Sequence, residues 1–99
     1  MAQPIYKVYM FKYTEAWYQL SKEEQDQHNA KIAEIMKQVG GETIKLCVSV
    51  WCSENWMAWG VEKFPSLEAV QQQSMLLFNI NHFRYIESNT YLGIDMPQM

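Results

Sequence analysis

Two histidines are the residues of this sequence best suited to acid–base chemistry. His28 lies four residues before Ile32 and seven before Ile35, so a helix here would place it on an apolar stripe that faces the interior. His82 follows a second predicted helix. An imidazole titrates near neutral pH, so either side chain could act as a general acid or base in a pocket. A structural histidine bonded to backbone or water is the competing interpretation for both, and ligation of a metal or haem is a third.

Aromatic side chains form a second group that could bind a ligand. Rings stack on flat apolar molecules, and tyrosine hydroxyls donate hydrogen bonds to carbonyl or phenolate oxygens. Trp17, in the connection after the first predicted strand, is the candidate for a pocket lid. Arg84 could bind a carboxylate, although a surface ion pair with Glu87 or Asp95 is the simpler interpretation. The predicted substrate-binding residues are Tyr6, Trp17, Trp51, Trp59, Arg84 and Tyr85, with packing in a core or interface as the alternative for the tryptophans.

The composition excludes several classes of function. The net charge is −3, the lysines are scattered and there is a single arginine, so the basic patch that nucleic-acid binding requires is missing. No apolar run approaches the ~18 residues of a membrane helix, and the N-terminus lacks the pattern of a secretory signal, which predicts a cytoplasmic protein. Neither nucleotide-binding nor metallohydrolase motifs occur.

The two cysteines are predicted to be structural. Cys47 and Cys52 fall in one predicted strand, where five residues of separation direct them to opposite faces and too far apart for a disulfide. We therefore expect two reduced, buried thiols. Neither a CxxC motif nor a nearby histidine suggests a metal site, so no metal or other cofactor is expected.

Local signals divide the chain into alternating strands and helices. The segment Ile5–Tyr13 is β-branched and aromatic on both faces, which is typical of a central strand covered on both sides. Ser21 and Glu24 form a capping box for a helix that runs to about Val39, where two glycines end it. The predicted strands span residues 5–13, 42–52, 56–64 and 88–94, and the predicted helices span 22–39 and 67–79, with a helical turn at 81–85.

This order, βαββαβ, predicts an α+β ferredoxin-like domain that covers residues 1–99, with a core at about 4–95. Such a domain places both helices on one face of a four-stranded antiparallel sheet. The predicted strands are apolar on both faces, so the other face would expose a large hydrophobic patch to water. The simplest solution is a homodimer in which a second copy packs sheet to sheet.

The whole pattern resembles the dimeric α/β-barrel superfamily, which includes antibiotic-biosynthesis monooxygenases. The matching features lie in residues 4–95: the strand around Tyr6–Phe11, the capped helix from Ser21, the hairpin that ends at Phe64-Pro65, the helix opened by Ser66, and the turn His82–Tyr85. The resemblance implies a ligand cavity between the sheet and its own helices. Members include cofactor-free monooxygenases, isomerases, polyketide cyclases, haem-degrading oxygenases and ligand-responsive regulators.

The sequence therefore leaves three functions open. The favoured one is a cofactor-independent enzyme of the monooxygenase, isomerase or cyclase type that acts on an apolar or aromatic metabolite, with His28 or His82 moving a proton. A non-catalytic ligand-binding or accessory dimer would use the same pocket. Haem binding through His82 is the third, and the sequence lacks the rest of that pattern.

Overall fold

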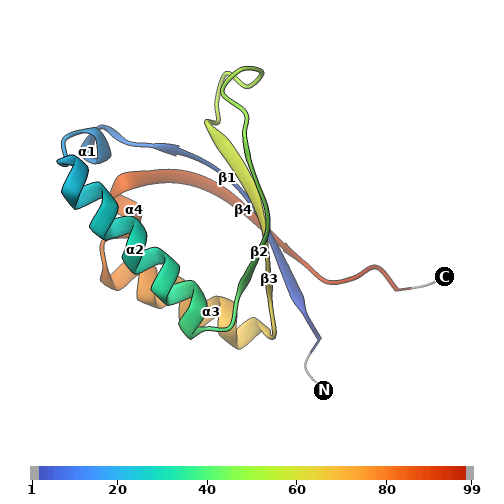
Figure 1. Ribbon diagram of the computed structural model, residues 1–99. Coiled ribbons are helices and arrows are strands. Elements are labelled where there is room, and N and C mark those ends of the chain that lie inside the picture. Colours follow the sequence, from blue (N-terminus) through green and yellow to red (C-terminus); the bar gives the residue numbers. More distant parts are fainter. Residues whose placement is uncertain (1–2, 98–99) are drawn as a thin grey trace.

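Four strands form one antiparallel sheet, and the helices lie on a single face of it (Figure 1). The computed structural model describes residues 3–97 of the chain. The sheet order β2-β3-β1-β4 is that of a ferredoxin-like fold, so the predicted fold class is confirmed. The elements are β1 (Ile5–Tyr13), α1 (Glu15–Tyr18), α2 (Lys22–Gln38), β2 (Glu42–Val48), β3 (Ala58–Phe64), α3 (Leu67–Asn79), α4 (His82–Tyr85) and β4 (Ile86–Gly93).

The central strand β1 has the predicted bounds and pairs with both β3 and β4. The register sets Lys7 opposite Glu62 and Tyr9 opposite Gly60. Because side chains alternate along a strand, the odd-numbered residues of β1 face the helices and the even-numbered residues face away. Gly60 leaves room for the Tyr9 ring, since a Cβ atom at Gly60 would lie 2.7 Å from Tyr9 Cζ.

The helix α2 begins at the predicted capping box. Ser21 Oγ accepts a hydrogen bond from the Glu24 amide at 3.1 Å, and Glu24 Oε1 accepts one from the Ser21 amide at 2.9 Å. The helix ends at Val39, and Gly40 follows with φ of 75°, a conformation that costs glycine little. None of the helices in the described part of the chain has the length and apolar character needed to span a bilayer.

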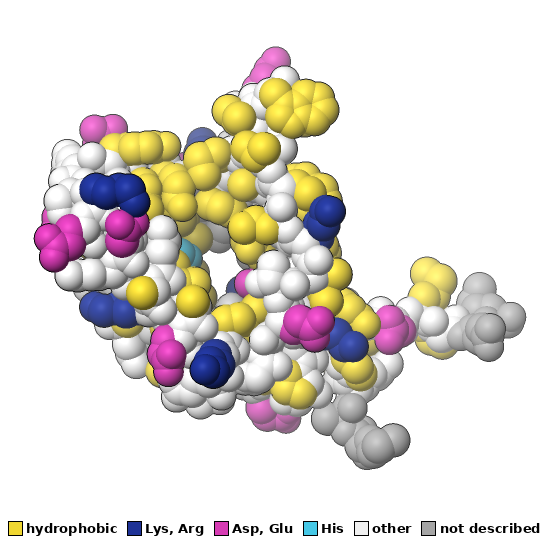
Figure 2. All heavy atoms as spheres, in the orientation of Figure 1, with side chains coloured by type: hydrophobic (Ala, Val, Ile, Leu, Met, Phe, Trp, Pro, Cys, Tyr) yellow, Lys and Arg dark blue, Asp and Glu magenta, His cyan; other side chains and the backbone are white. Residues whose placement is uncertain are grey.

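The hydrophobic core lies at one end of the helix layer, where α2 ends, α3 begins and β3 ends. Phe64 is fully buried there and packs with Val39, Ala69 and Val70. Away from this end the helices stand clear of the sheet and leave a hollow, which Figure 2 shows with hydrophobic side chains around it. The fold therefore closes its core at one end and keeps a cavity beside it.

The β2–β3 hairpin differs from the prediction because a compact loop replaces the ends of both strands. β2 ends at Val48 and β3 begins at Ala58. The carbonyl of Ser49 accepts hydrogen bonds from the amides of Cys52 and Ser53 at 3.0 and 2.8 Å, and this turn competes with strand pairing. The expectation of two buried thiols in one strand is therefore wrong: Cys47 is half-buried, and Cys52 is exposed in the loop, although both are free thiols.

The buried face of α3 is also rotated relative to the prediction. The spacing of residues in this helix predicts that Gln71, Gln72 and Gln73 lie on the outer face and that the buried stripe is Leu67, Val70, Ser74, Leu77 and Phe78. In the structure, Leu67 and Phe78 are 47% and 66% exposed. Gln73, predicted on the polar outer face, is only 3% exposed, whereas Ser74 is exposed. This rotation brings a polar amide against the cavity.

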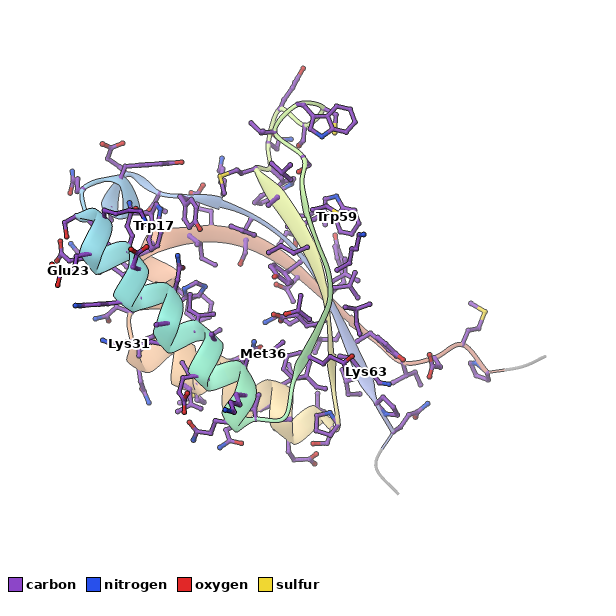
Figure 3. All side chains as sticks on the ribbon, viewed as in Figure 1. Trp17, Glu23, Lys31, Met36, Trp59 and Lys63 are labelled. Carbon is purple, nitrogen blue, oxygen red and sulfur yellow. The ribbon has the colours of Figure 1, made fainter. Side chains whose placement is uncertain are left out.

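The face of the sheet opposite the helices carries an uncovered apolar patch, as predicted. Trp59 and Lys63 lie on that side in Figure 3, away from the helices. Val8 pairs with Val61 and with Tyr91, so these side chains share the face of Trp59. The exposed fractions are 37% for Val8, 38% for Trp59 and 59% for Tyr91.

Candidate functional site

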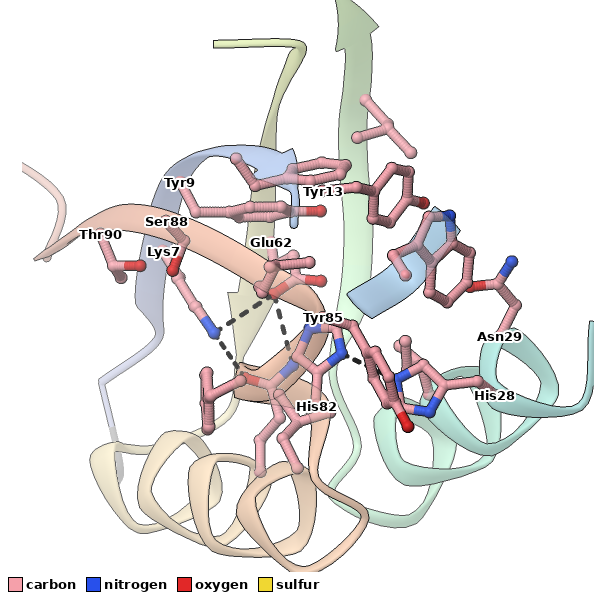
Figure 4. A pocket seen from close by; sticks show the side chains of 18 residues that line it. Lys7, Tyr9, Tyr13, His28, Asn29, Glu62, His82, Tyr85, Ser88 and Thr90 are labelled. Carbon is pink, nitrogen blue, oxygen red and sulfur yellow. Dashed lines mark hydrogen bonds and ion pairs between the residues drawn. The ribbon is translucent and has the colours of Figure 1, made fainter. Parts of the chain in front are cut away.

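A cavity of about 230 Å³ lies between the sheet and the helices α2, α3 and α4. One side is a wall of aromatic rings from β1 and α1, and the rest of the lining includes two histidines and the polar side chains of Lys7, Glu62 and Gln73 (Figure 4). The volume lies slightly below the usual range for ligand sites, ~300–1,000 Å³, which suits a small ligand of one or two rings.

The aromatic wall is a series of ring contacts in which two stacked pairs are joined by the edge-on contact of Phe11 with Tyr13. The Tyr13 and Trp17 rings lie parallel, with centroids 4.4 Å apart and an interplanar angle of 8°. Tyr9 stacks on Phe11 at 5.9 Å, and the Tyr85 ring meets Trp17 edge-on at 6.1 Å. Trp17 is only 6% exposed, because the short helix α1 folds it back under the start of α2. A flat apolar ligand could pack against these rings at little cost in side-chain entropy.

The two histidines form a hydrogen-bonded pair at the cavity wall. His28 Nε2 and His82 Nδ1 are 3.0 Å apart, and the rings lie nearly parallel with centroids 5.3 Å apart. His28 comes from the buried stripe of α2 and is 7% exposed. His82 is the first residue of α4, a helical turn that follows Asn81, whose backbone is in the left-handed conformation with φ of 60°. Asparagine adopts this conformation more readily than most residues, so Asn81 can turn the chain sharply and direct His82 back toward α2.

Both imidazoles are neutral at pH 7. Burial, the neighbouring His28 and Lys7 lower the pKa of His82 from 6.5 to about 4. Burial and the charge of Lys31 also lower the pKa of His28. A neutral imidazole has one N–H and one lone pair, so a single proton lies between the two rings. The pair can therefore accept or donate a proton at pH 7.

A polar cluster faces the histidines from the sheet and α3. Lys7 Nζ donates a hydrogen bond to Gln73 Oε1 at 2.9 Å and lies 3.9 Å from Glu62 Oε1. Gln73 Nε2 donates to Glu62 Oε1 at 3.4 Å, so the amide holds both charged groups. Burial lowers the pKa of Lys7 and raises that of Glu62. Burial, followed by the Glu62 charge and Tyr13, raises the pKa of Tyr9 to about 12, so its hydroxyl stays protonated.

Four of the eight predicted site residues meet in the cavity: Trp17, His28, His82 and Tyr85. The other four lie elsewhere. Tyr6 and Trp59 are on the uncovered face of the sheet, and Trp51 is 80% exposed in the hairpin loop. Arg84 is exposed on α4, and Glu87, one of its two expected partners, pairs with Lys12 at 3.3 Å.

The sequence prediction missed the polar cluster. The available signal was the position of Lys7 among the inward residues of β1, between Ile5 and Tyr9. A charged side chain within a buried aromatic row is costly unless it is paired, and such residues are often functional. In residues 3–97, no three side chains of the types His, Cys, Asp and Glu come close enough together to hold a metal ion.

No protein-family model and no curated protein sequence matches the chain. Several solved structures match it, at low sequence identity. A Rhodopseudomonas palustris protein of unknown function superposes with a TM-score of 0.68 at 10% identity, over 99% of this chain and 86% of the other. SnoaB, a cofactor-independent oxygenase from Streptomyces nogalater, gives 0.59 at 12% identity, over 99% and 98%. The hydroxynitrile lyase of Passiflora edulis gives 0.57 at 12% identity, over 99% and 100%.

These similarities define the class by its fold. The chain shares its ferredoxin-like fold with these solved structures, as the sequence predicted. The structural neighbours include two enzymes of different chemistry and a protein of unknown function. The activity of this chain must accordingly be argued from its own site.

Proposed function

We propose that this protein is a homodimeric, cofactor-independent enzyme that moves a proton on a small apolar or aromatic metabolite. The observation that carries this proposal is the neutral His28–His82 pair at the wall of an aromatic cavity. Monooxygenase, isomerase and cyclase reactions on such molecules can all begin with removal of a proton from carbon or oxygen. The two enzymes among the structural neighbours support a small-molecule activity for this fold.

His82 is the proposed acid–base residue. When His82 donates its Nδ1 proton to His28 Nε2, its other ring nitrogen carries a lone pair and can accept a substrate proton. When His28 donates instead, that nitrogen of His82 carries a proton and can act as an acid. The tautomer of the pair thus selects the role, and the lowered pKa of His82 keeps the base form available at pH 7.

Lys7 is the proposed electrostatic partner of the reaction. Removing a proton from a neutral substrate leaves negative charge, most stable on an oxygen atom. The ammonium group of Lys7 lies in the same cavity, held by Gln73 at 2.9 Å, and can stabilise that charge without reorganising. Glu62, at 3.9 Å, keeps Lys7 charged in these apolar surroundings.

An apolar chromogenic carbon acid tests proton abstraction without knowledge of the natural substrate. In nitrobenzisoxazole a base takes the ring C–H proton, the N–O bond breaks, and a coloured cyanonitrophenolate forms. We expect the wild-type protein to accelerate this ring opening and His82→Gln to lose at least about tenfold. Arg84→Gln is the matched control, an exposed position on the same helical turn, and should keep the wild-type rate. Binding without acceleration would contradict the enzyme and favour a ligand-binding protein.

The homodimer rests on the uncovered sheet face. Val8, Trp59 and Tyr91 present apolar surface on that face, a combination that monomers rarely leave in water. A second copy is the occupant we propose, packed sheet to sheet through this patch. Light scattering at micromolar concentration should give twice the chain mass for the wild type and a lower mass for Val8→Lys. A single-chain mass for the wild type would exclude the dimer.

A further inference from the structure

A second, polar hollow lies beside the His28 ring. It has a volume of about 160 Å³ and is lined by Leu20, Glu24, Gln27, His28, Lys31 and Tyr85. His28 and Tyr85 line both this hollow and the aromatic cavity, whereas His82 lines the cavity alone. Of these two residues His28 forms the hydrogen bond with His82, so its side chain connects His82 with the polar hollow.

The surroundings of His28 favour passage of a proton over its retention. The charged and titratable groups around the ring are Glu24 and Lys31 on its own helix and His82 and Tyr85 on α4. The ring is only 7% exposed, and the charge of Lys31 opposes a second positive charge on it. The His28 ring is buried, but the hollow beside it is open to solvent. Two of the side chains that line it, Gln27 and Lys31, are exposed, so water can reach it.

We infer that His28 is a proton relay that connects His82 to bulk water through the polar hollow while a ligand fills the cavity. This inference deepens the proposed function and rests on it. A ligand packed against the aromatic wall would separate His82 from water on the cavity side. A base that holds a substrate proton must then pass it on by another route.

The relay releases one proton to water for each proton that it takes from the ligand. His82 accepts a proton from the ligand and becomes a cation. It passes its Nδ1 proton to His28 Nε2 across the 3.0 Å hydrogen bond, and His28 releases its Nδ1 proton to water in the hollow. His28 now donates to His82, and His82 holds the former substrate proton as an acid. The reverse sequence, with one proton taken from water, restores the base form. His28 therefore acts through His82 and need not touch the substrate.

Ionisation of a ligand held in the cavity measures the relay directly. 4-Nitrophenol serves as the probe, because its phenolate absorbs visible light and its neutral form does not. After a stopped-flow jump from about pH 6 to about pH 8, we expect the phenolate of the bound probe to form in the wild type at least about tenfold faster than the probe dissociates. Gln27→Phe, which fills the hollow from an exposed position and leaves both histidines in place, should slow this ionisation at least about tenfold. His28→Leu should slow it similarly.

Glu34→Phe is the matched control, because it makes a similar change at an exposed position of the same helix outside the hollow. It should ionise the bound probe as the wild type does. Phenolate formation in the wild type no faster than probe dissociation, or at the wild-type rate in Gln27→Phe, would overturn the relay. The measurement requires no turnover, so a protein that ionises the bound probe rapidly but does not open the nitrobenzisoxazole ring would keep the relay and lose the proposed enzyme activity.

Discussion

Acid should destabilise this protein in a pH window that His82 defines. The pKa of this histidine is lowered from 6.5 to about 4 by burial, by His28 and by Lys7. Below pH 6.5 the unfolded chain takes up a proton at this position and the folded chain does not, so the free energy of unfolding falls as pH falls. Each pH unit in the window costs about 1.36 kcal/mol, which gives a total of about 3 kcal/mol by pH 4. Partial exposure of the ring reduces this to about 2 kcal/mol.

The assay is urea unfolding at several pH values between 7 and 4, at one protein concentration because a dimer adds a concentration term. His82→Gln removes the titrating group and keeps a side chain that can bond to His28. The difference in unfolding free energy between wild type and variant should therefore shrink by about 2 kcal/mol across the window. The lowered pKa of His28 acts in the same direction and the raised pKa of Glu62 in the opposite one, but both remain in the variant. A difference that stays constant with pH would refute the reasoning.

The remaining predictions concern the polar cluster and the aromatic wall. Gln73→Leu should lower the unfolding free energy by about 1–3 kcal/mol in urea, because it leaves Lys7 and Glu62 buried without their shared amide. Lys7→Met should raise the pKa of Glu62 further, which carboxyl NMR titration measures, because it removes the cation that now lowers that pKa. Gly60→Ala should weaken naphthalene binding, followed by tryptophan fluorescence, because its Cβ would lie 2.7 Å from the Tyr9 ring and push it into the cavity. Unchanged affinity would show that the ring moves without filling the site.

Helices and strands could be predicted from the sequence wherever neighbouring residues determine their bounds. β1 and α3 have the predicted bounds, because strand alternation and the Ser66 cap depend on residues close in sequence. The predicted ends of the two hairpin strands were wrong, because turn hydrogen bonds at Ser49 replace strand pairing there. The strand propensity of single residues does not account for such a turn. The buried face of α3 differs from the predicted one because it meets a cavity that accepts Gln73. The prediction assumed an apolar core, and that assumption places glutamine on the outer face.

The sequence by itself determined the βαββαβ order, the apolar far face of the sheet and the inward direction of His28. Helical and strand periodicity are short-range properties, so the sequence displays them directly. Only the tertiary structure decided that His82, 54 residues away, meets His28, and that Lys7 lies beside Glu62. Those contacts depend on how α4 docks against α2 and on the register of β1 with β3. Both are set by the packing of the whole chain, because no local preference fixes the distance between segments far apart in sequence.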